Sequence, residues 1–398
     1  MSGEAACVKE FELCFTRGAG ASSLLSTTGR RVKPFVPSKL PPTGIDWADL
    51  VPAIGRANRA LAHYDGVLLG IPHPEVMLAP LTTQEAVLSS AIEGTQATLG
   101  EVLEFEAGAE MAEESRREDV REILNCRRAL RHAEGALERK PFHLNLLLEL
   151  HAVLLDSVRG RGRGELRSVQ NWIGPPGTPM AKAYFVPPEP TRMRRGLDDW
   201  ERYYHAGERD PLVQLAIVHA QFEILHPFVD GNGRLGRILI PLFLFEKRVL
   251  SRPLFYLSAY LEAHRGAYVR GLRALDGGDS WNRWIAFFLG ALTEQAEANA
   301  AKARAILALY ERLKQRILEL THSQYAVPLL DRLFARPIFA ASHLAADDAL
   351  PSKQMVAQLL RKLREAGILR PVREARGRRA QVLALAELVN LCEGLEVV

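Results

Sequence analysis

His226-Pro-Phe-Val-Asp-Gly-Asn-Gly-Arg-Leu-Gly-Arg237 is the stretch of this chain that decides its fold. Upstream, Asp210 and Pro211 form an N-cap and first-turn pair, and the apolar spacing that follows predicts a helix running into the stretch. Downstream, Ile238 to Phe245 is apolar on every side, which predicts a helix buried in the middle of the domain, kinked or broken near Pro241. The stretch is therefore predicted to form a loop between two packed helices.

The loop has the features of an anion-binding site. Gly231 and Gly233, in a loop with Asn232, let the backbone approach a ligand closely, and the N–H groups at the start of the next helix, expected to open with Arg234, can point at a phosphate. Arg234 and Arg237 are three residues apart, so they share a face of the first turn and can both bind phosphate oxygens. The pattern predicts that this loop holds a phosphate group.

Two side chains of the loop add reactive chemistry. Asp230 is a hard oxygen ligand beside the expected phosphate, as a Mg²⁺ that bridges nucleotide phosphates requires. His226 is the nearby group that can accept a proton near neutral pH. Each element alone has a common structural explanation, because glycine pairs form turns, histidines pack beside core helices and arginine pairs are often surface charge. Their order within so short a segment favours a nucleotide site.

Length and composition place the chain among soluble globular proteins. Its 398 residues suggest two or three domains, and 47% hydrophobic with 25% charged residues exclude disorder throughout and a fibrous architecture. The longest apolar runs fall far below the ~20 residues of a membrane span, and the N-terminal residues lack the pattern of a secretory signal. No membrane contact is expected. The chain has four scattered cysteines, Cys7, Cys14, Cys126 and Cys392, and they form no CxxC pair. This pattern indicates neither a disulfide framework nor a thiolate zinc site, and it favours a reducing cytoplasm.

The spacing of apolar residues predicts a mainly α protein in four parts. Residues 1–40 are expected to form a proline-rich, extended N-terminal arm, and residues 41–110 a helical N-terminal region. Residues 111–320 are expected to form the helical core, and residues 325–398 a C-terminal module. The sequence contains no internal repeat.

Two local patterns inside these parts matter for the site. The clearest early helix is predicted to begin near Thr82, which stands in capping-box spacing with Glu85, and to end at Gly94. Between Arg159 and Pro190, glycines and prolines surround two β-like pieces, at 168–173 and 183–186. These pieces predict a β-hairpin on the helical scaffold, with a loose surface loop as the alternative.

The C-terminal module has the pattern of a winged helix-turn-helix. Helices are predicted at 342–346 and 352–365, followed by strands at 368–372 and 380–385 around a basic turn. The net charge of the chain is only +4, but residues 352–380 carry nine Lys and Arg against two Glu. DNA is therefore a candidate partner, and the residues expected to contact its phosphates are Lys353, Arg373, Arg376, Arg378 and Arg379.

The sequence resembles the Fic family, whose signature HPFx(D/E)GN(G/K)RxxR is matched by residues 226–237 at every fixed position. Ser89-Ser-Ala-Ile-Glu93-Gly94 resembles the family's inhibitory motif (S/T)xxxE(G/N), placed before the core as in the N-terminally inhibited class. Residues 167–174 and 183–188 resemble the β-hairpin flap that aligns the target protein. The resemblance covers roughly residues 45–320, and bacterial relatives often carry a C-terminal winged helix. It implies a helical Fic core with a flap, preceded by a helical regulatory region.

The function implied by the resemblance is transfer of AMP from ATP to a Ser, Thr or Tyr hydroxyl of a target protein, or of the protein itself, with release of pyrophosphate. His226 would take the proton of that hydroxyl, and Asp230 would hold Mg²⁺ on the α- and β-phosphates. Arg237 would hold the γ-phosphate. The rest of the triphosphate would be held by Gly231, Asn232 through its side chain as well as its amide, Gly233 and Arg234.

The resemblance also assigns roles outside the loop. Tyr268 resembles an adenine-pocket residue, although Leu275-Asp276-Gly277-Gly278 stands where some relatives have Asn. Glu93, within the inhibitory motif Ser89, Glu93 and Gly94, would pair with Arg237 and compete with the γ-phosphate. The same glutamate could instead position a water that strips AMP from modified protein. The flap would add the target as an extra strand along Asn171, Trp172, Ile173, Tyr184, Phe185 and Val186.

Other functions stay open at this point. The main competitor is a DNA-binding regulator whose Fic core serves as a nucleotide sensor. A kinase or phosphocholine-transfer variant is disfavoured, because relatives that turn the nucleotide around depart from the positions of Gly233 and Arg237, and this chain keeps both. Metal-dependent hydrolysis by His226 and Asp230 lacks further histidine ligands nearby. The sequence leaves a homodimer open.

Overall fold

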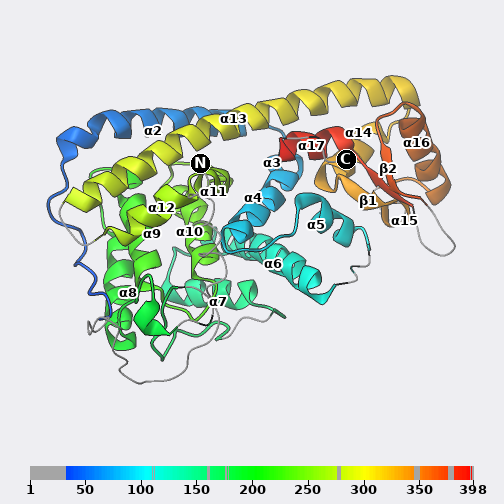
Figure 1. Ribbon diagram of the computed structural model, residues 1–398. Helices are drawn as coiled ribbons and strands as arrows, with labels where there is room; N and C mark the ends of the chain where they lie inside the picture. Colours follow the sequence, from blue (N-terminus) through cyan, green and yellow to red (C-terminus); the bar gives the residue numbers. More distant parts are fainter. Residues whose placement is uncertain are drawn as a thin grey trace, which may run out of the picture. The chain divides into compact units, whose positions relative to one another are not determined.

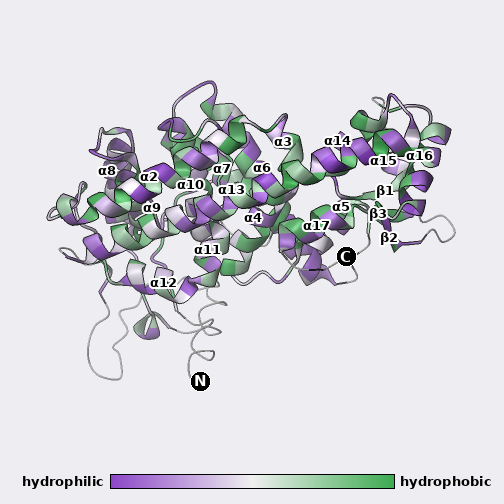
Figure 2. Cartoon of the chain, turned by 90° about the horizontal axis from the view of Figure 1, so that it is seen from above, coloured by the Kyte–Doolittle hydropathy of each residue, from purple (hydrophilic) through white to green (hydrophobic). Residues whose placement is uncertain are grey.

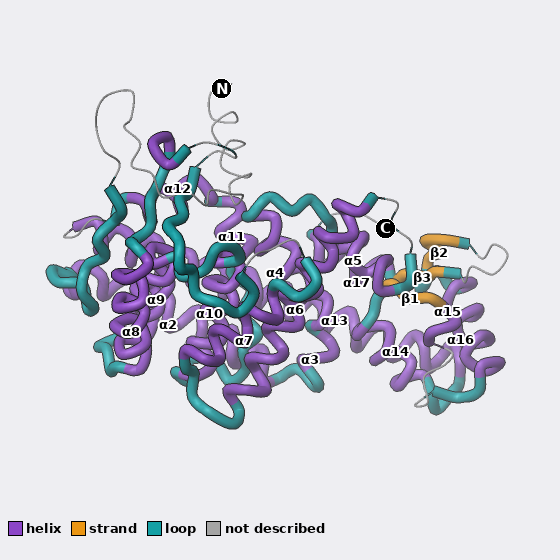
Figure 3. The backbone as a smooth tube through the Cα atoms, turned by 90° about the horizontal axis from the view of Figure 1, so that it is seen from below, coloured by secondary structure: helices purple, strands orange, loops and turns teal. Residues whose placement is uncertain are grey.

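The computed structural model describes residues 33–109, 111, 113–158, 162–174, 177, 179–275, 279–344, 350–374, 381–394 and 396. The described chain is mainly helical, as predicted, and the strands of its one described sheet lie close together in sequence and space (Figures 1 and 3). No helix in the described ranges is long and apolar enough to cross a membrane.

The chain divides into two compact units that interleave along the sequence. The first unit comprises the described residues up to Ala62, Leu88–Thr95 and Asn125–Ala296, and the second comprises His63–Val87, Gln96–Leu124 and the residues from Glu297 onward. Four long helices pass from one unit into the other: α2 (Trp47–Leu69), α4 (Ala79–Ile92), α6 (Glu114–Leu137) and α13 (Asp279–Thr321). The units therefore do not follow the four predicted linear parts, which stay predictions.

The first unit is built around two buried helices. Every residue of α9 (Pro211–Leu225) from Leu212 onward is buried except Glu223, and α10 (Asn232–Glu246) is buried from Asn232 to Leu244. Helices α9 and α10 pack on each other, and α8 (Pro190–His205) packs on α9. The other elements of this unit are α7 (Leu144–Leu154), the short 3₁₀ helix η1 (Met180–Lys182), α11 (Ser258–Ala263) and α12 (Arg265–Arg273).

The start of α9 is where the sequence placed it. Asp210 caps the helix by accepting hydrogen bonds from the backbone N–H groups of Leu212 and Val213, at 2.8 and 3.1 Å. Pro241 neither kinks nor breaks the predicted buried helix enough to end it, because α10 continues through it to Glu246. Of the two predicted alternatives, the break near Pro241 was therefore wrong, and the kink stays a prediction.

Two further predictions need correction. Helix α4 begins at Ala79, so Thr82 lies inside its first turns rather than at its cap, and Pro80 is the first-turn signal that marks the true start. The predicted hairpin at 168–186 is reduced to one antiparallel bridge, between Ile173 and Phe185, with η1 in the connection. The end of α4 before Gly94, which has a φ of 101°, is confirmed.

The second unit contains the C-terminal elements. Its helices are α3 (Pro74–Met77), α5 (Leu99–Glu106), α14 (Ala326–Ala335), α15 (Ala341–Leu344), α16 (Lys353–Glu365) and α17 (Ala386–Glu393), and its strands are β1 (Ile338–Ala340), β2 (Arg370–Arg373) and β3 (Val382–Ala384). The strands form an antiparallel sheet in the order β1-β3-β2. Both predicted C-terminal helices and both predicted strands are present, whereas β1 was not predicted.

Helix α16 shows why these elements form. Ser352 caps it, and its buried residues recur at helical spacing, at Val356, Leu359, Leu360 and Leu363. Figure 2 shows hydrophobic and hydrophilic residues on this one helix. Lys353 is exposed at its first turn. Arg376, Arg378 and Arg379 lie outside the described residues, so the winged helix-turn-helix and its basic turn stay predictions.

Candidate functional site

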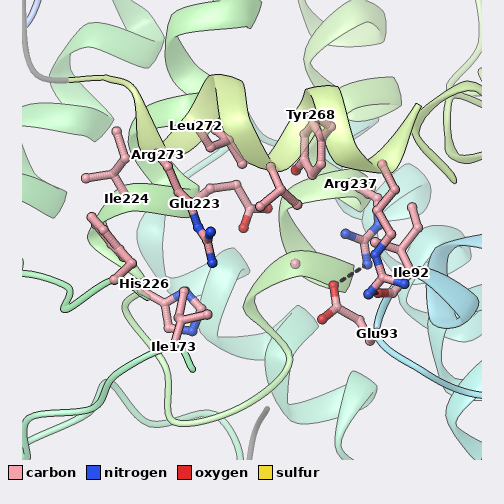
Figure 4. Close-up of a pocket in the computed structure, with 14 residues that line it drawn as sticks. Ile92, Glu93, Ile173, Glu223, Ile224, His226, Arg237, Tyr268, Leu272 and Arg273 are labelled. Carbon is pink, nitrogen blue, oxygen red and sulfur yellow. Dashed lines mark hydrogen bonds and ion pairs between the residues drawn. The ribbon is translucent and has the colours of Figure 1, made fainter. Parts of the chain in front are cut away.

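His226 occupies an unusual backbone position at the end of α9. Its N–H donates to the carbonyl of Phe222 at 3.0 Å, and its φ of 47° and ψ of 59° lie in the left-handed region. A residue with a Cβ adopts this conformation only when its surroundings compensate for the strain. The turn brings the chain directly from the buried α9 into the loop, and the imidazole lines a cavity there (Figure 4).

Arg167 is the main support of this turn. Its side chain is buried, and its Nε donates to the carbonyl of His226 at 2.8 Å while Nη2 donates to the carbonyl of Leu225 at 3.3 Å. The same guanidinium also donates to the carbonyls of Val169, at 3.2 Å, and Pro188. Burial lowers the pKa of Arg167 to about 10, which leaves it a cation at neutral pH. One arginine thus joins the histidine turn to both ends of the predicted flap.

The loop that follows is held by its own side chains. The Asn232 side chain accepts from the N–H of Phe228 at 2.9 Å and donates to the carbonyl of Phe228 at 3.0 Å. His151 on α7 accepts from the N–H of Gly164 through Nδ1, at 2.9 Å, so its Nε2 carries the proton and donates to the carbonyl of Asp230, also at 2.9 Å. Burial lowers the pKa of His151 to about 4, which fixes this neutral form.

The glycine and the carboxylate of the loop complete the turn into α10. Gly231 has a φ of 77°, so the backbone favours glycine, and a Cβ there would lie 3.3 Å from the side chain of Leu154. Asp230 accepts from the N–H of Gly231 at 2.6 Å, and its Oδ1 lies 3.5 Å from Nη2 of Arg234. The first N–H groups of α10 have no acceptor within the helix, as at every helix start. These groups are suited to bind an anion.

Arg237 is bound by the end of α4. Its Nε donates to Oγ of Ser89 at 2.9 Å, and its Nη2 donates to the carbonyl of Ser89 and to Oε1 of Glu93, both at 2.8 Å (Figure 4). Gly233 makes the approach of Glu93 feasible, because a Cβ at this position would lie 2.1 Å from Oε1 of Glu93. Arg265 on α12 donates to the carbonyl of Ile92 and so holds the same helix end. The predicted inhibitory motif and Arg237 therefore meet.

Glu93 and Arg237 each stabilise the ionised form of the other. Burial by itself raises the pKa of Glu93, but the guanidinium of Arg237, helped by Arg234 and Arg265, outweighs it and holds that pKa below 4.5. Burial likewise tends to lower the pKa of Arg237, and Glu93 reverses this, so its pKa lies above the ordinary value. Both groups are ionised at neutral pH. The carboxylate thus stands where an anionic ligand of Arg237 would bind.

The cavity beside this pair joins the predicted residues. It has a volume of about 100 Å³, and part of it is open to solvent. Glu93 and Arg237 line one part of it, and His226 lines another. Gly233 lies beside Glu93 and Arg237. Its apolar wall is formed by Ile92, Ile173, Phe185, Ile224, Val269 and Leu272.

Tyr268 lines the same cavity, and its hydroxyl is hydrogen-bonded to His219. Nδ1 of His219 lies 3.2 Å from the carbonyl of Gly236, which can only accept, and Nε2 lies 2.9 Å from the hydroxyl of Tyr268. Burial lowers the pKa of His219 to about 3, so the ring is neutral, with Nδ1 donating and Nε2 accepting from Tyr268. The predicted adenine-pocket residue therefore has a fixed orientation.

Two residues of the predicted flap line the cavity, and a third is hydrogen-bonded to the N-terminal arm. Ile173 and Phe185 line the cavity, and Asn171 donates to the carbonyl of Phe228 at 3.2 Å, tying the flap to the loop. Val186 is buried, and its carbonyl accepts from the N–H of Phe35 in the N-terminal arm at 2.9 Å. Tyr184 is 39% exposed, and Trp172 is half-buried. The edge beside Val186 is therefore used by the chain itself.

Asp230 is the residue of the loop that could bind a metal ion. No group of three or more His, Cys, Asp or Glu side chains that could hold a metal occurs within the part of the chain that the structure describes. Mg²⁺ is commonly bound by one or two carboxylates, with the remaining ligands supplied by substrate phosphates and water. One carboxylate beside an anion-binding helix start fits that requirement, so the residues present suit a Mg²⁺ that arrives with a nucleotide.

The predicted residues of the loop and of the cavity fall into two groups. Those that line the cavity are Glu93, Ile173, Phe185, His226, Gly233, Arg237 and Tyr268, whereas Asp230, Gly231, Asn232 and Arg234 form the adjoining turn and do not line it. The Asn232 side chain, predicted to hold phosphate, is engaged with Phe228 here, which leaves its N–H for that role. Sequence reasoning missed the contributions of His151, Arg167, His219, Glu223 and Arg265. Three of them carried a signal, because His219 and Glu223 lie on the helix that leads to His226 and Arg167 begins the predicted flap segment.

Removing the Arg167 charge should raise the pKa of His226. Burial lowers that pKa to about 3, and Arg167 is the next largest cause. We expect that Arg167→Met shifts the titration of His226 to higher pH, measured by NMR of the labelled imidazole. Arg167→Lys keeps the charge and should retain a depressed value. Identical titration curves in the parent and in Arg167→Met would contradict this role.

Comparison with known proteins identifies the family models and relatives that this chain resembles. Residues 51–134 match the family described as Fic/DOC family N-terminal, and residues 141–244 match the Fic/DOC family. The chain is 30% identical over 160 residues to protein adenylyltransferase fic-1 of Caenorhabditis briggsae, covering 39% of this chain and 30% of that protein. It is 38% identical over 94 residues to a probable protein adenylyltransferase of Aquifex aeolicus, covering 22% of this chain and 29% of that protein. The match thus spans under a third of these relatives.

Solved structures share the fold. A Fic family protein from Desulfovibrio desulfuricans superposes with a TM-score of 0.55 at 19% identity, covering 86% of this chain and 98% of that one. Fic-1 from Caenorhabditis elegans superposes with a TM-score of 0.51 at 20% identity, covering 66% of this chain and 75% of that one. At these identities the similarity concerns the fold.

Proposed function

Since this chain belongs to the Fic family, we propose that it transfers AMP from ATP to a Ser, Thr or Tyr hydroxyl of a target protein or of itself, releasing pyrophosphate. One observation carries the proposal: the buried Arg237, whose ionised partner Glu93 stands where a phosphate would bind, lines one cavity with His226. The test is transfer of label from α-phosphate-labelled ATP to protein.

The triphosphate is proposed to lie along the start of α10. Its γ-phosphate would bind Arg237, and the N–H groups of Gly231, Asn232 and Gly233 with Arg234 would bind the remainder. Asp230 would hold Mg²⁺, which supplies charge neutralisation on the α- and β-phosphates when bound. These groups act by position and charge, which is most of what phosphoryl-type transfer requires.

His226 is proposed as the general base. The target hydroxyl oxygen would form a bond to the α-phosphorus as the bond to the pyrophosphate oxygen breaks, and the hydroxyl proton would pass to the imidazole. A pKa of about 3 keeps this imidazole neutral and able to accept a proton, although it makes a weak base. A bound nucleotide places negative charge in the cavity and would raise that pKa toward neutrality.

Glu93 is proposed to restrain the reaction. While it pairs with Arg237, the γ-phosphate must compete for the same guanidinium, so ATP binds in a poor geometry. The alternative is that Glu93 positions a water for removal of AMP from modified protein.

Ile173 and Phe185, together with the other flap residues, are proposed to set the register of the target segment. We propose the cytoplasm as the location of the reaction, supported by the four scattered cysteines of the sequence, which form no CxxC pair.

DNA binding through the C-terminal module is a second candidate. The exposed start of α16, with Lys353 in its first turn, together with the basic composition of residues 352–380, favours it. We expect duplex DNA to be shifted in a gel at low salt, and Arg376→Ala/Arg378→Ala/Arg379→Ala to weaken the shift. Phosphate contacts must weaken steeply as salt rises. A shift that is absent, or insensitive to salt and to the triple variant, would contradict DNA binding by this module.

A further inference from the structure

Glu223 is an acidic side chain in the cavity for which the sequence gives no role. It is the one residue of α9 after Pro211 that is not buried, and it lines the cavity with His226 and Tyr268. Figure 4 shows its carboxyl group directed into the cavity between Arg273 and Tyr268. Its Oε1 is nevertheless shielded from solvent and has no hydrogen-bond partner among the described residues. A buried polar oxygen without a partner is costly, so a ligand with suitable donors would stabilise it.

Gly236 gives this carboxyl group its place. A Cβ at Gly236 would lie 2.1 Å from Oε1 of Glu223, so only glycine leaves room for the oxygen against α10. The arrangement repeats that of Gly233 and Glu93 one turn earlier. The two glycines of α10 therefore each admit one carboxyl group, and Glu93 has a cationic partner while Oε1 of Glu223 has none.

The environment of Glu223 differs from that of Glu93. Burial raises its pKa to about 8, only partly offset by Arg237, while Glu93 raises it further. A carboxyl group offers an acceptor oxygen whether it is protonated or ionised. It suits a neutral ligand group that donates hydrogen bonds, such as a hydroxyl, better than another anion.

The position of Glu223 selects which part of ATP it meets. The phosphate-binding residues Gly233 and Arg237 lie at one part of the cavity, and the apolar residues Ile173, Val269 and Leu272 offer a wall for a flat base. Glu223 lies one helical turn before His226, beside which the α-phosphate is proposed to react. The group between a base and an α-phosphate is the ribose, whose two hydroxyls are donors.

We propose that Glu223 recognises the ribose of the nucleotide by accepting hydrogen bonds from its 2′- and 3′-hydroxyls. The inference rests on the proposed function and adds a specificity residue to it. A site built to bind hydroxyls rejects an analogue that lacks them, because its own polar group is then left unpaired. The protein should therefore discriminate ATP from 2′,3′-dideoxyATP, and Glu223 should carry the discrimination.

The test is calorimetry of both nucleotides with Mg²⁺, using Glu93→Gly protein as the parent. We expect the parent to bind ATP about ten- to a hundredfold more tightly than 2′,3′-dideoxyATP, the range for a lost hydrogen bond to a carboxyl group. In Glu223→Met the ratio should fall close to one, and in Glu223→Gln, which retains an acceptor, it should be intermediate. Glu189→Gln, an exposed site outside the cavity, should leave the ratio unchanged.

The outcomes distinguish a failure of the proposed function from a failure of the proposed role of Glu223. If the parent binds neither nucleotide, the proposed function fails. If the parent binds ATP but the ratio is the same in Glu223→Met, or already close to one in the parent, the role of Glu223 is wrong. If Glu223→Met does not fold, the Glu223→Gln ratio decides alone, and a value equal to that of the parent overturns the proposal.

Discussion

Replacing His226 with alanine is expected to abolish AMP transfer while leaving ATP binding intact. The imidazole lines the cavity beside the proposed α-phosphate position, whereas the phosphate-binding groups belong to α10 and to the loop. Loss of a general base lowers a rate by about 10²- to 10⁴-fold. We expect the variant to incorporate no measurable label from α-phosphate-labelled ATP. Calorimetry of the same variant should show ATP uptake.

The control for this variant is another histidine of the same unit. His205 is exposed at the end of α8, away from the cavity, so His205→Ala should label like the parent. Undiminished labelling by His226→Ala would reject its role as the base. Loss of both labelling and ATP binding would instead assign the His226 side chain to holding the loop.

Replacing Glu93 with glycine is expected to increase AMP transfer by roughly 10- to 100-fold. The variant frees Arg237 from a charge-assisted hydrogen bond, and such bonds contribute about 1.5–3 kcal/mol, which the γ-phosphate no longer has to displace. The measurement is the initial rate of self-labelling at a fixed ATP concentration. Glu93→Gln, which keeps a hydrogen-bonding oxygen without the charge, should give an intermediate rate.

The pH dependence follows from the depressed pKa of Glu93. A carboxylate whose folded pKa lies below its unfolded value stays paired above both values, and the pair is lost as pH falls through the folded pKa. The inhibition should therefore persist across the neutral range. Equal labelling rates in Glu93→Gly and the parent would remove the inhibitory role. If only the parent strips AMP from modified protein, Glu93 acts in removal instead.

The chemistry of the loop could be predicted from the sequence because it is local. The residues from His226 to Arg237 are adjacent, and the two flanking helices follow from a cap at Asp210 and an apolar run after Arg237. Gly231 was expected to permit a close backbone approach to a ligand, which stays a prediction, and its φ of 77° shows the left-handed conformation that favours glycine. Local patterns of this kind need no knowledge of the rest of the chain.

What the sequence did not predict depends on tertiary contacts. Arg167 binds the carbonyl of His226 across 59 positions of sequence, and Arg265 binds Ile92 across 173. No spacing rule connects such pairs. Gly233 was expected to serve the phosphate, yet the structure shows that it also admits the Glu93 side chain. Thr82 failed as a helix start because Pro80 sets an earlier one.

AMP transfer at the Arg237 cavity is the central claim, and it is tested most directly by the intact mass of Glu93→Gly protein after incubation with ATP and Mg²⁺. We predict a species heavier than the parent by one AMP, and its absence when His226→Ala is combined with Glu93→Gly. The absence of added mass on Glu93→Gly protein, together with the absence of modification on the proteins of an added cell lysate, would contradict the account. So would the same added mass in the double variant.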